Sequence, residues 1–230
     1  MYDVPQDARL EIKFASYRSK LDRVLNWIKL HPAAFYSPHP DRQVNNVYFD
    51  THNSAAYVQN LSGASSRVKV RYRWYGESQT PGRGVLEIKC KRNFFGWKKR
   101  FACESLPEIP DSLDWREIEK RLSASLPHEG RLWLQTYPAP TILNRYLRRY
   151  FVSHDNRIRV TVDTDQAVWD QRYKSIPNYD QASNLPDTLV VEVKFARDDR
   201  TMASDIIQSM PIRVSRHSKF MNGVRAGTFE

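Results

Sequence analysis

The sequence predicts an α+β fold in which antiparallel strands form a closed or nearly closed barrel and helices pack on its outside. Three observations lead to this prediction. Charged and apolar residues alternate with a period of two in several segments, as in strands that have one polar and one apolar face. Other segments carry apolar residues at helical spacing. The chain has 230 residues and is 40% hydrophobic, which is enough apolar material for a core.

The charge balance and the cysteine count narrow the class of protein. The 36 lysines and arginines outnumber the 26 aspartates and glutamates, and the net charge of +10 predicts a polyanionic partner: nucleic acid, anionic lipid or a phosphate-rich ligand. Two cysteines exclude a disulfide framework and a cysteine-rich zinc site, and they suit a cytoplasmic location.

No stretch approaches the ~20 apolar residues of a membrane span, so we expect no transmembrane segment. Because no repeat or linker divides the sequence, we expect one domain over residues 1–230.

Amphipathic helices are predicted in four segments, which are residues 16–31, 114–125, 130–137 and 201–210. In the first, Ser16 is expected to cap the helix and Tyr17 to begin its apolar face. In the second, Trp115 and Leu122 lie on one apolar face, and the fourth is expected to stop before Pro211. These helices are expected to cover the outside of the strands.

Strands are predicted in six segments, which are residues 9–14, 66–75, 85–91, 97–103, 156–165 and 189–195. Their alternate charged positions are Glu11, Lys13, Lys69, Arg71, Arg73, Glu87, Lys89, Lys91, Arg157, Arg159, Asp163, Glu192 and Lys194. Residues 85–91 and 97–103 form a hairpin around residues 93–96. Either Lys98 or Lys99 then faces the charged side, because strand parity after a turn does not follow from the sequence.

The polar face shared by these strands is almost entirely charged, whereas a solvated sheet face usually includes neutral residues. Like charges that lie opposite each other on neighbouring strands repel. A solvated face explains any one of these strands, but five together need either strong screening by water or a counter-anion. We favour the anion. The apolar faces then point outward beneath the helices, and the charged faces line the lumen of the barrel.

An ordered set of motifs extends over nearly the whole chain. They are Glu-x-Lys at residues 11–13, alternate cations at 69–73, LEIK at 86–89, YLRRYF at 146–151, RIRVTVDTD at 157–165, VVEVKF at 190–195 and SKFMNG at 218–223. In this combination the sequence resembles the VTC domain. That domain is the catalytic part of the vacuolar transporter chaperone polyphosphate polymerases, within the CYTH-like triphosphate tunnel metalloenzyme superfamily.

The resemblance implies an antiparallel tunnel in which rows of lysine and arginine bind the triphosphate of ATP and polyphosphate. The implied catalytic cations are Arg71, Arg73, Lys89, Arg148 and Arg159. The implied substrate-binding residues are Lys13, Lys98, Tyr146, Arg216, Ser218 and Lys219, to which the charged strand face adds Lys69, Lys91 and Lys194. Glu192 is implied as the metal ligand. Arg216 stands where the family carries a lysine, which keeps the charge but changes the donor geometry.

The implied reaction moves the terminal phosphoryl of ATP onto inorganic polyphosphate or pyrophosphate, with Mn²⁺ or Mg²⁺ as cofactor. A triphosphatase on the same scaffold is an alternative. Hydrolytic relatives usually open with Glu-x-Glu-x-Lys, and Arg9 replaces the first of these glutamates here, which favours the polymerase. A noncatalytic polyanion-binding domain, or regulation by polyphosphate or inositol polyphosphate, also stays open, as does a membrane-protein partner.

A nucleic-acid partner is not expected, because Tyr72 and Trp74 lie on the face opposite the cations and cannot stack bases beside them. Among the histidines, His217 is expected nearest the substrate, because it lies within the motif that contains Ser218 and Lys219. Cys90 falls on the apolar side of its strand and is expected in the core.

Overall fold

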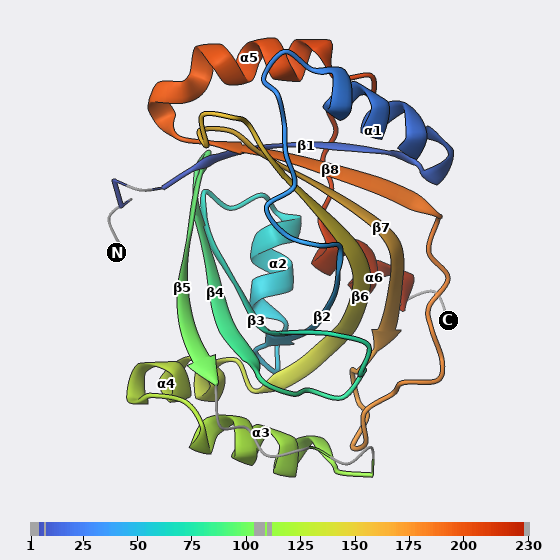
Figure 1. Ribbon diagram of the computed structural model, residues 1–230. Coiled ribbons are helices and arrows are strands. Elements are labelled where there is room, and N and C mark those ends of the chain that lie inside the picture. Colours follow the sequence, from blue (N-terminus) through green and yellow to red (C-terminus); the bar gives the residue numbers. More distant parts are fainter. Residues whose placement is uncertain (1–4, 7, 104–108, 110–111, 228–230) are drawn as a thin grey trace.

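Eight strands form a single antiparallel sheet in the computed structural model, which describes residues 5–6, 8–103, 109 and 112–227 (Figure 1). The strands are β1 (Leu10–Tyr17), β2 (Arg42–Asp50), β3 (Ser66–Tyr75), β4 (Gly84–Arg92), β5 (Phe95–Cys103), β6 (Ala139–Val152), β7 (Arg159–Asp170) and β8 (Thr188–Phe195). Their order in the sheet is β1-β8-β7-β6-β2-β3-β4-β5. The first strand therefore pairs with the last, and the sheet curls into a half-barrel, which confirms the predicted fold class.

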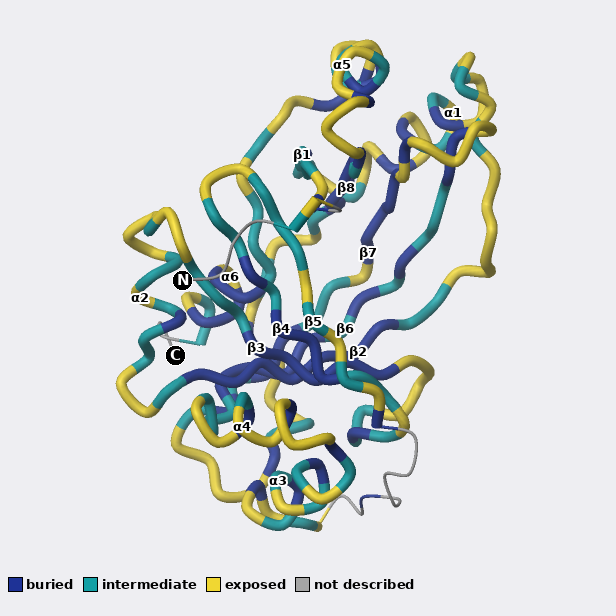
Figure 2. Tube along the Cα trace, turned by 90° about the vertical axis from the view of Figure 1, so that its left-hand side faces the viewer, coloured by how far each residue is buried: buried dark blue, intermediate teal, exposed yellow. Residues whose placement is uncertain are grey.

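Helices lie around this curled sheet. They are η1 (Arg18–Lys20), α1 (Leu21–Leu30), α2 (Ala55–Leu61), α3 (Trp115–Ala124), α4 (His128–Thr136), η2 (Arg197–Asp199), α5 (Arg200–Ser209) and α6 (Lys219–Ala226). Figures 1 and 2 show α1 and α5 together beside β1 and β8, and α3 with α4 at the opposite side of the molecule.

The outer faces of the strands are apolar and are buried beneath these helices. Val160 and Val191 of the β7–β8 region pack with Val24 and Ile28 of α1 and with residues of α5. A second cluster joins the outer faces of β2, β3 and β4 to α3, with Trp115, Ile118 and Leu122 buried. Cys90 belongs to this cluster, as its place on the apolar side predicted. Burial of the apolar faces leaves the charged positions on the concave side.

Helix α6 packs against one end of the concave side, next to α2. Phe220 stacks on Tyr48 of β2 with 5.2 Å between the ring centroids. Phe220, Met221 and Val224 form a small apolar cluster with Tyr48, Ile142 and Val168. The helix begins at Ser218, whose hydroxyl accepts a hydrogen bond from the Met221 amide (3.3 Å).

Two contacts bring the edges of the curled sheet together. Arg9 and Gly96 exchange backbone hydrogen bonds of 3.2 and 3.3 Å, which joins the start of β1 to β5. Farther along β1, Phe14 pairs with Val214, and the Ala15 amide donates to the Ser215 hydroxyl (2.6 Å). The segment before α6 therefore borders β1 where β5 does not. We call the space enclosed by the concave face and this segment the lumen.

A bulge in β7 changes which residues face inward. Opposite β6, the pairing moves from Leu147 with Thr164 to Arg145 with Ala167, and Asp165 has a positive φ of 54°. Before the bulge, Arg159 and Asp163 lie on the concave side; after it, Val168 packs under α6 and Trp169 lies in the outer core. Bulges of this kind re-aim side chains.

The helix predicted over residues 16–31 begins later than expected, and the predicted roles of Ser16 and Tyr17 are wrong. Ser16 pairs with Leu189 and Tyr17 with Thr188, so both belong to β1. Backbone pairing with β8 thus outweighs the helical spacing of the side chains. Five elements were not predicted: β2, β6, α2, η2 and α6.

Arg157 does not join the charged concave face, which corrects the expectation from its spacing. The strand predicted over residues 156–165 begins only at Arg159. Arg157 lies before it and donates through Nε to Asp199 of η2 (2.6 Å). The loop that turns into β7 therefore directs this side chain to the outside.

Candidate functional site: a charged lumen

Charged side chains from seven strands and α6 face the lumen. They are Glu11 and Lys13 of β1, Lys69, Arg71 and Arg73 of β3, Glu87, Lys89 and Lys91 of β4, Lys98 and Arg100 of β5, Arg148 of β6, Arg159 and Asp163 of β7, Glu192 and Lys194 of β8, and Lys219 of α6. Lys69 interacts electrostatically with Lys13 and Glu11, although β3 and β1 are not neighbours in the sheet. The charges therefore face one another across an enclosed space.

Glu87 is the centre of the first charge cluster. Its Oε2 accepts from Arg71 Nε and Nη2 (2.8 and 2.5 Å), and its Oε1 accepts from Lys98 (2.9 Å). Arg100 lies 3.4 Å from the same carboxylate. Burial alone would raise the pKa of Glu87, but Arg71, Arg73 and Lys98 hold it well below its ordinary value. The carboxylate is ionised and fixes the guanidinium of Arg71.

Arg73 is held by hydrogen bonds to residues of β2 and β6. Arg73 Nε donates to Asn46 Oδ1 and its Nη2 to Tyr146 Oη, both at 2.8 Å. Asn46 in turn donates to Asn144 Oδ1 (2.8 Å). Three hydroxyl and amide groups of β2 and β6 therefore fix Arg73, which is 6% exposed.

Asp163 is the centre of the second cluster. It accepts two hydrogen bonds of 2.6 Å from Arg148 and one of 2.5 Å from Lys219. The Lys219 ammonium also lies 4.5 Å from the centre of the Tyr146 ring. Burial would raise the pKa of Tyr146, but Arg148, Arg73 and Lys219 lower it below its ordinary value. The Tyr146 hydroxyl is thus placed among cations where a phosphate oxygen could also bind.

Two carboxylates and two ammonium groups form the third cluster. Lys13 Nζ lies 3.1 Å from both Glu11 and Glu192. Lys194 Nζ lies 3.3 Å from Glu11 and 2.5 Å from Glu192. Burial would lower the pKa of Lys13, but Glu192 and Glu11 raise it above its ordinary value. These four residues neutralise one another at the junction of β1 and β8.

A row of three lysines crosses β3, β4 and β5. Lys69 lies opposite Lys89, and Lys89 lies opposite Lys98. Burial lowers the pKa of Lys69 to about 7, and Lys13 and Arg67 add to this effect. Burial likewise lowers the pKa of Lys89 well below its ordinary value. Such a row is unfavourable unless an anion lies against it.

Several lumen cations have no carboxylate partner. Among the described residues, no ion pair is formed by Lys69, Lys89, Lys91 or Arg159. Lys69 donates to the Ser218 hydroxyl (2.9 Å) instead. Arg159 lies near Arg9 and Arg100, which with burial lower its pKa. The excess positive charge is therefore gathered inside the curled sheet.

The remaining predicted residues lie around this cluster. Lys98 faces the lumen, whereas Lys99 donates to Glu129 of α4 (2.5 Å), which resolves the parity of the hairpin. Arg216 is exposed, and it lies close enough to Lys91 to contribute to the lowered pKa of that lysine. All of the predicted site residues thus lie on the lumen or at its edge.

Sequence reasoning missed several groups that organise the lumen. Asn46 and Tyr48 lie on β2, which was not predicted as a strand, and Tyr48 accepts from Arg71 (3.0 Å). Arg100 faces inward by the same alternation as Lys98, so the resolved hairpin parity would have identified it. Asp163 was placed on the charged face by its spacing, but its pairing with Arg148 needs the β6–β7 register.

Glu192 and its neighbours fit a divalent metal that arrives with phosphates. The described residues contain no cluster of three or more acidic, histidine or cysteine ligands. Magnesium, however, commonly uses only one or two carboxylates and takes its other ligands from phosphates and water. Glu192 and Glu11 supply two such carboxylates, and the buried Thr161 hydroxyl opposite Glu192 has no hydrogen-bond partner among the described residues.

The charges of the lumen are complementary to those of a linear phosphate anion. The guanidinium groups of the lumen present paired donors that match phosphate oxygens, and its ammonium groups act as compact charges. The clusters around Glu87 and Asp163 hold the side chains in place before the ligand binds. Pre-positioned donors of this kind suit a phosphoryl group whose charge grows during transfer.

Comparisons with known proteins agree with this geometry. A candidate adenylate cyclase from Vibrio parahaemolyticus is 12% identical, with a TM-score of 0.51 over 91% of this chain and 95% of that chain. A candidate adenylyl cyclase from Hippeastrum, described as having a dominant triphosphatase activity, is 11% identical, with a TM-score of 0.50 over 96% of this chain and 95% of that chain. These likenesses show a shared fold. No curated protein sequence matches.

Every helix in the described part of the chain is too short or too polar to span a bilayer.

The family comparison is more specific than the structural one, because a single family model aligns with nearly the entire sequence. The model for the VTC domain matches residues 8–227, which include every residue discussed above that faces the lumen. The chain therefore belongs to the VTC domain family.

Proposed function

We propose that this protein is a polyphosphate polymerase that transfers the terminal phosphoryl of ATP to inorganic polyphosphate or pyrophosphate. The observation that carries the proposal is the row of Lys69, Lys89 and Lys98 together with the unpaired Arg159 on the facing wall. Lys69 and Lys89 are partly buried, whereas Lys98 and Arg159 are exposed at the rim of the lumen, and apart from Glu87 beside Lys98 no carboxylate of the described residues pairs with these cations. A linear chain of phosphates has the shape and the charge to compensate them.

Membership of the VTC domain family supports triphosphate chemistry, and two features favour polymerisation over hydrolysis. Arg9 occupies the position of the first glutamate of the hydrolytic motif, and its backbone closes the barrel against Gly96. In addition, Lys13 and Lys194 neutralise Glu11 and Glu192. This leaves less free carboxylate to activate a water molecule. The triphosphatase activity described for the Hippeastrum protein makes hydrolysis the second candidate.

The residues act by position and charge, since phosphoryl transfer requires little covalent help from protein groups. Arg71 and Arg73 bind nonbridging oxygens of the triphosphate, and Arg148 with Lys219 binds others from the side of β6 and α6. A terminal oxygen of the acceptor attacks the γ-phosphorus, the bond from that phosphorus to the bridging oxygen breaks, and ADP leaves. Tyr146, which lies between these two groups of cations, donates to a phosphate oxygen.

Mn²⁺ or Mg²⁺, when bound, supplies positive charge to the phosphate oxygens. Glu192 would hold it, with Glu11 beside it on β1. The ammonium groups of Lys13 and Lys194 would then turn from these carboxylates toward phosphate. The two buried free cysteines agree with the cytoplasmic location that we propose.

The deciding experiment is incubation of the protein with ATP and Mn²⁺ or Mg²⁺. A ladder of polyphosphate on a gel supports the polymerase, whereas phosphate release without a ladder supports the triphosphatase. If folded protein gives neither product and yet binds tripolyphosphate, it is a noncatalytic polyanion-binding domain and the proposal is wrong.

Two neighbouring arginines test whether the lumen binds the phosphates. Arg159→Ala removes an unpaired lumen cation and should weaken tripolyphosphate binding by about tenfold. Arg157→Ala is the matched control, because that side chain is paired with Asp199 outside the lumen. Equal affinities of the two variants would remove the argument from the shared lumen.

A further inference from the structure

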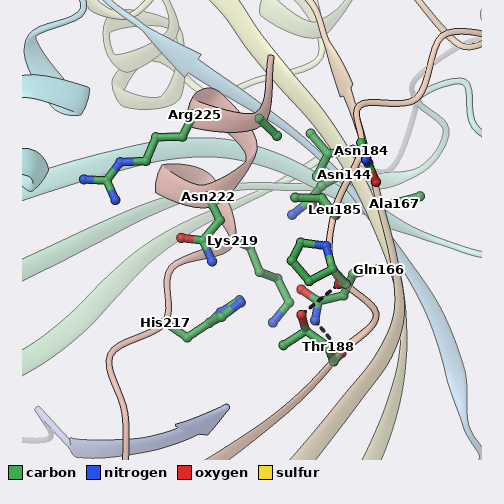
Figure 3. A pocket seen from close by; sticks show the side chains of 13 residues that line it. Asn144, Gln166, Ala167, Asn184, Leu185, Thr188, His217, Lys219, Asn222 and Arg225 are labelled. Atoms are coloured by element: carbon green, nitrogen blue, oxygen red, sulfur yellow. Dashed lines mark hydrogen bonds between the residues drawn. The ribbon is translucent and has the colours of Figure 1, made fainter. Parts of the chain in front are cut away.

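A pocket adjoins the lumen beneath α6 (Figure 3). Its volume is about 310 Å³, and it lies between α6, the bulged part of β7 and the segment that precedes β8. Its polar side chains include four amides, which are Asn144, Gln166, Asn184 and Asn222. Val168, Leu185 and Pro186 supply aliphatic walls. None of the described residues that line it is acidic.

The pocket and the lumen share Lys219. Its side chain lines the pocket, and its ammonium donates to Asp163 in the lumen (2.5 Å). On another wall, Asn144 accepts from Asn46, which itself holds Arg73. A ligand whose phosphates are bound by Arg73 and Lys219 can therefore extend its remaining part into this pocket.

The β7 bulge shapes one wall. Without the one extra residue at the bulge, the alternation that points Arg159 and Asp163 inward would turn Val168 and Gln166 outward. The bulge reverses the parity, and Gln166 then lines the pocket and donates to the Thr188 carbonyl (2.9 Å). The strand is thus charged where it faces the lumen and amide-bearing where it faces the pocket.

Most of the polar side chains that line the pocket are uncharged. His217 lines it with Nδ1 buried and without a hydrogen-bond partner among the described residues. Burial, together with Lys219 and Lys13, lowers the pKa of His217 to about 4, so the ring is uncharged at neutral pH. Figure 3 shows Arg225 extending away from the other labelled side chains. This lining suits an uncharged organic group better than a polyphosphate chain.

We propose that this pocket binds the nucleoside of a nucleoside triphosphate whose phosphates lie in the lumen. The inference rests on the proposed function and deepens it by assigning the part of the site that recognises the organic half of the substrate. Aliphatic walls pack against the faces of a base, and amides supply both donors and acceptors for its edge. The unpartnered His217 Nδ1 provides another acceptor or donor for the base or the ribose.

The test compares two ligands that share the triphosphate. We would measure the binding of a nonhydrolysable ATP analogue and of inorganic tripolyphosphate by calorimetry. Asn222→Trp places a bulky ring at the pocket, and Gln166→Ala removes an amide with little change in packing. Gln208→Trp on the exposed side of α5 is the matched control.

Both pocket variants should lower the affinity for the ATP analogue by about tenfold and keep the affinity for tripolyphosphate within about twofold of the unmodified protein. The control variant should change neither affinity. The pocket assignment is overturned if Gln166→Ala and a folded Asn222→Trp keep full affinity for the ATP analogue. It is also overturned if their affinities for the ATP analogue and for tripolyphosphate fall equally. If the unmodified protein binds neither ligand, the proposed function itself fails. The two failures are therefore distinct.

Discussion

Arg148 on β6 and Asp163 on β7 form a two-point ion pair in which both N–O distances are 2.6 Å. The same carboxylate accepts from Lys219, the first residue of α6. Asp163 is fully buried and Arg148 is 7% exposed. One aspartate therefore pairs with two lumen cations and ties α6 to the wall of the barrel.

Replacing Asp163 should be strongly destabilising. Asp163→Asn leaves Arg148 and Lys219 buried with less compensating charge, which should lower the free energy of unfolding by about 3–5 kcal/mol in urea denaturation. The control is Asp41→Asn, because Asp41 is half exposed just before β2 where it pairs with Arg149, and its loss should cost less than about 1 kcal/mol. Similar losses for both variants would contradict the central role of Asp163.

The row of Lys69, Lys89 and Lys98 should lower the stability of the free protein and raise its affinity for phosphate chains. Lys89→Gln removes repulsion with Lys69 and Lys98, so the free protein should melt at a higher temperature. The same change should weaken tripolyphosphate binding by about tenfold or more, because a charged donor is lost. Lys99→Gln on the outer face should leave binding unchanged. A Lys89 variant that is less stable and binds normally would refute this account of the row.

Stability and binding should depend on pH in opposite directions. In the folded protein the pKa of Lys69 is lowered from 10.5 to about 7, so the unfolded chain binds more protons between these values. The free energy of unfolding should therefore rise as pH increases from 7 to 10.5. Triphosphate binding, which needs the ammonium form, should weaken over the same range.

Calorimetry at pH 8 in buffers of different ionisation enthalpy should detect proton uptake by the protein when tripolyphosphate binds. Lys69→Arg stays charged at this pH, so it should take up fewer protons, and it also corrects for protons exchanged by the ligand itself. Equal proton uptake by the two proteins would show that Lys69 is already charged in the free state.

Gly84 should be intolerant of any side chain. A Cβ at this position would lie 2.2 Å from the Arg73 carbonyl oxygen and 2.9 Å from the Tyr72 ring. Gly84→Ala must therefore displace the backbone that carries Arg73, and we expect a loss of about 1–3 kcal/mol together with weaker triphosphate binding. At Gly82, two residues earlier, a Cβ meets nothing within 4 Å. Urea denaturation should show Gly82→Ala close to the unmodified protein.

The alternation of charged and apolar residues predicted which side chains face the lumen wherever a strand runs without a bulge. Lys69, Arg71 and Arg73 face the lumen because β3 keeps its pleat over its full length and its apolar side is covered by α3. In β7 the alternation holds only as far as the bulge that follows Thr164, because this bulge reverses the parity of the strand. Nothing in the local sequence fixes the position of a bulge, which depends on the pairing with β6.

Other parts of the site could not be found from local patterns. Strand β2 is buried on both faces, so Asn46 and Tyr48 show no alternation of polar and apolar residues. The contact of Arg73 with Tyr146 joins positions 73 residues apart and requires the strand order β6-β2-β3. Helix α6 had a detectable signal in Ser218 as its N-cap, but its place at the end of the lumen follows only from packing against Tyr48.

The contact between β1 and Val214 has a consequence for the order in which the protein matures on the ribosome. β8, which pairs with β1, is made after the other strands of the sheet, and the free edge of β1 is bordered by residues 214–215, which are made later still. Until Val214 and Ser215 emerge, the lysines and arginines of the concave face line an open trough in contact with water. The desolvation of Lys69 and Lys13 is therefore completed only after residues 214–215 have been made. An anion present in the cell at that moment would ease the final step of folding.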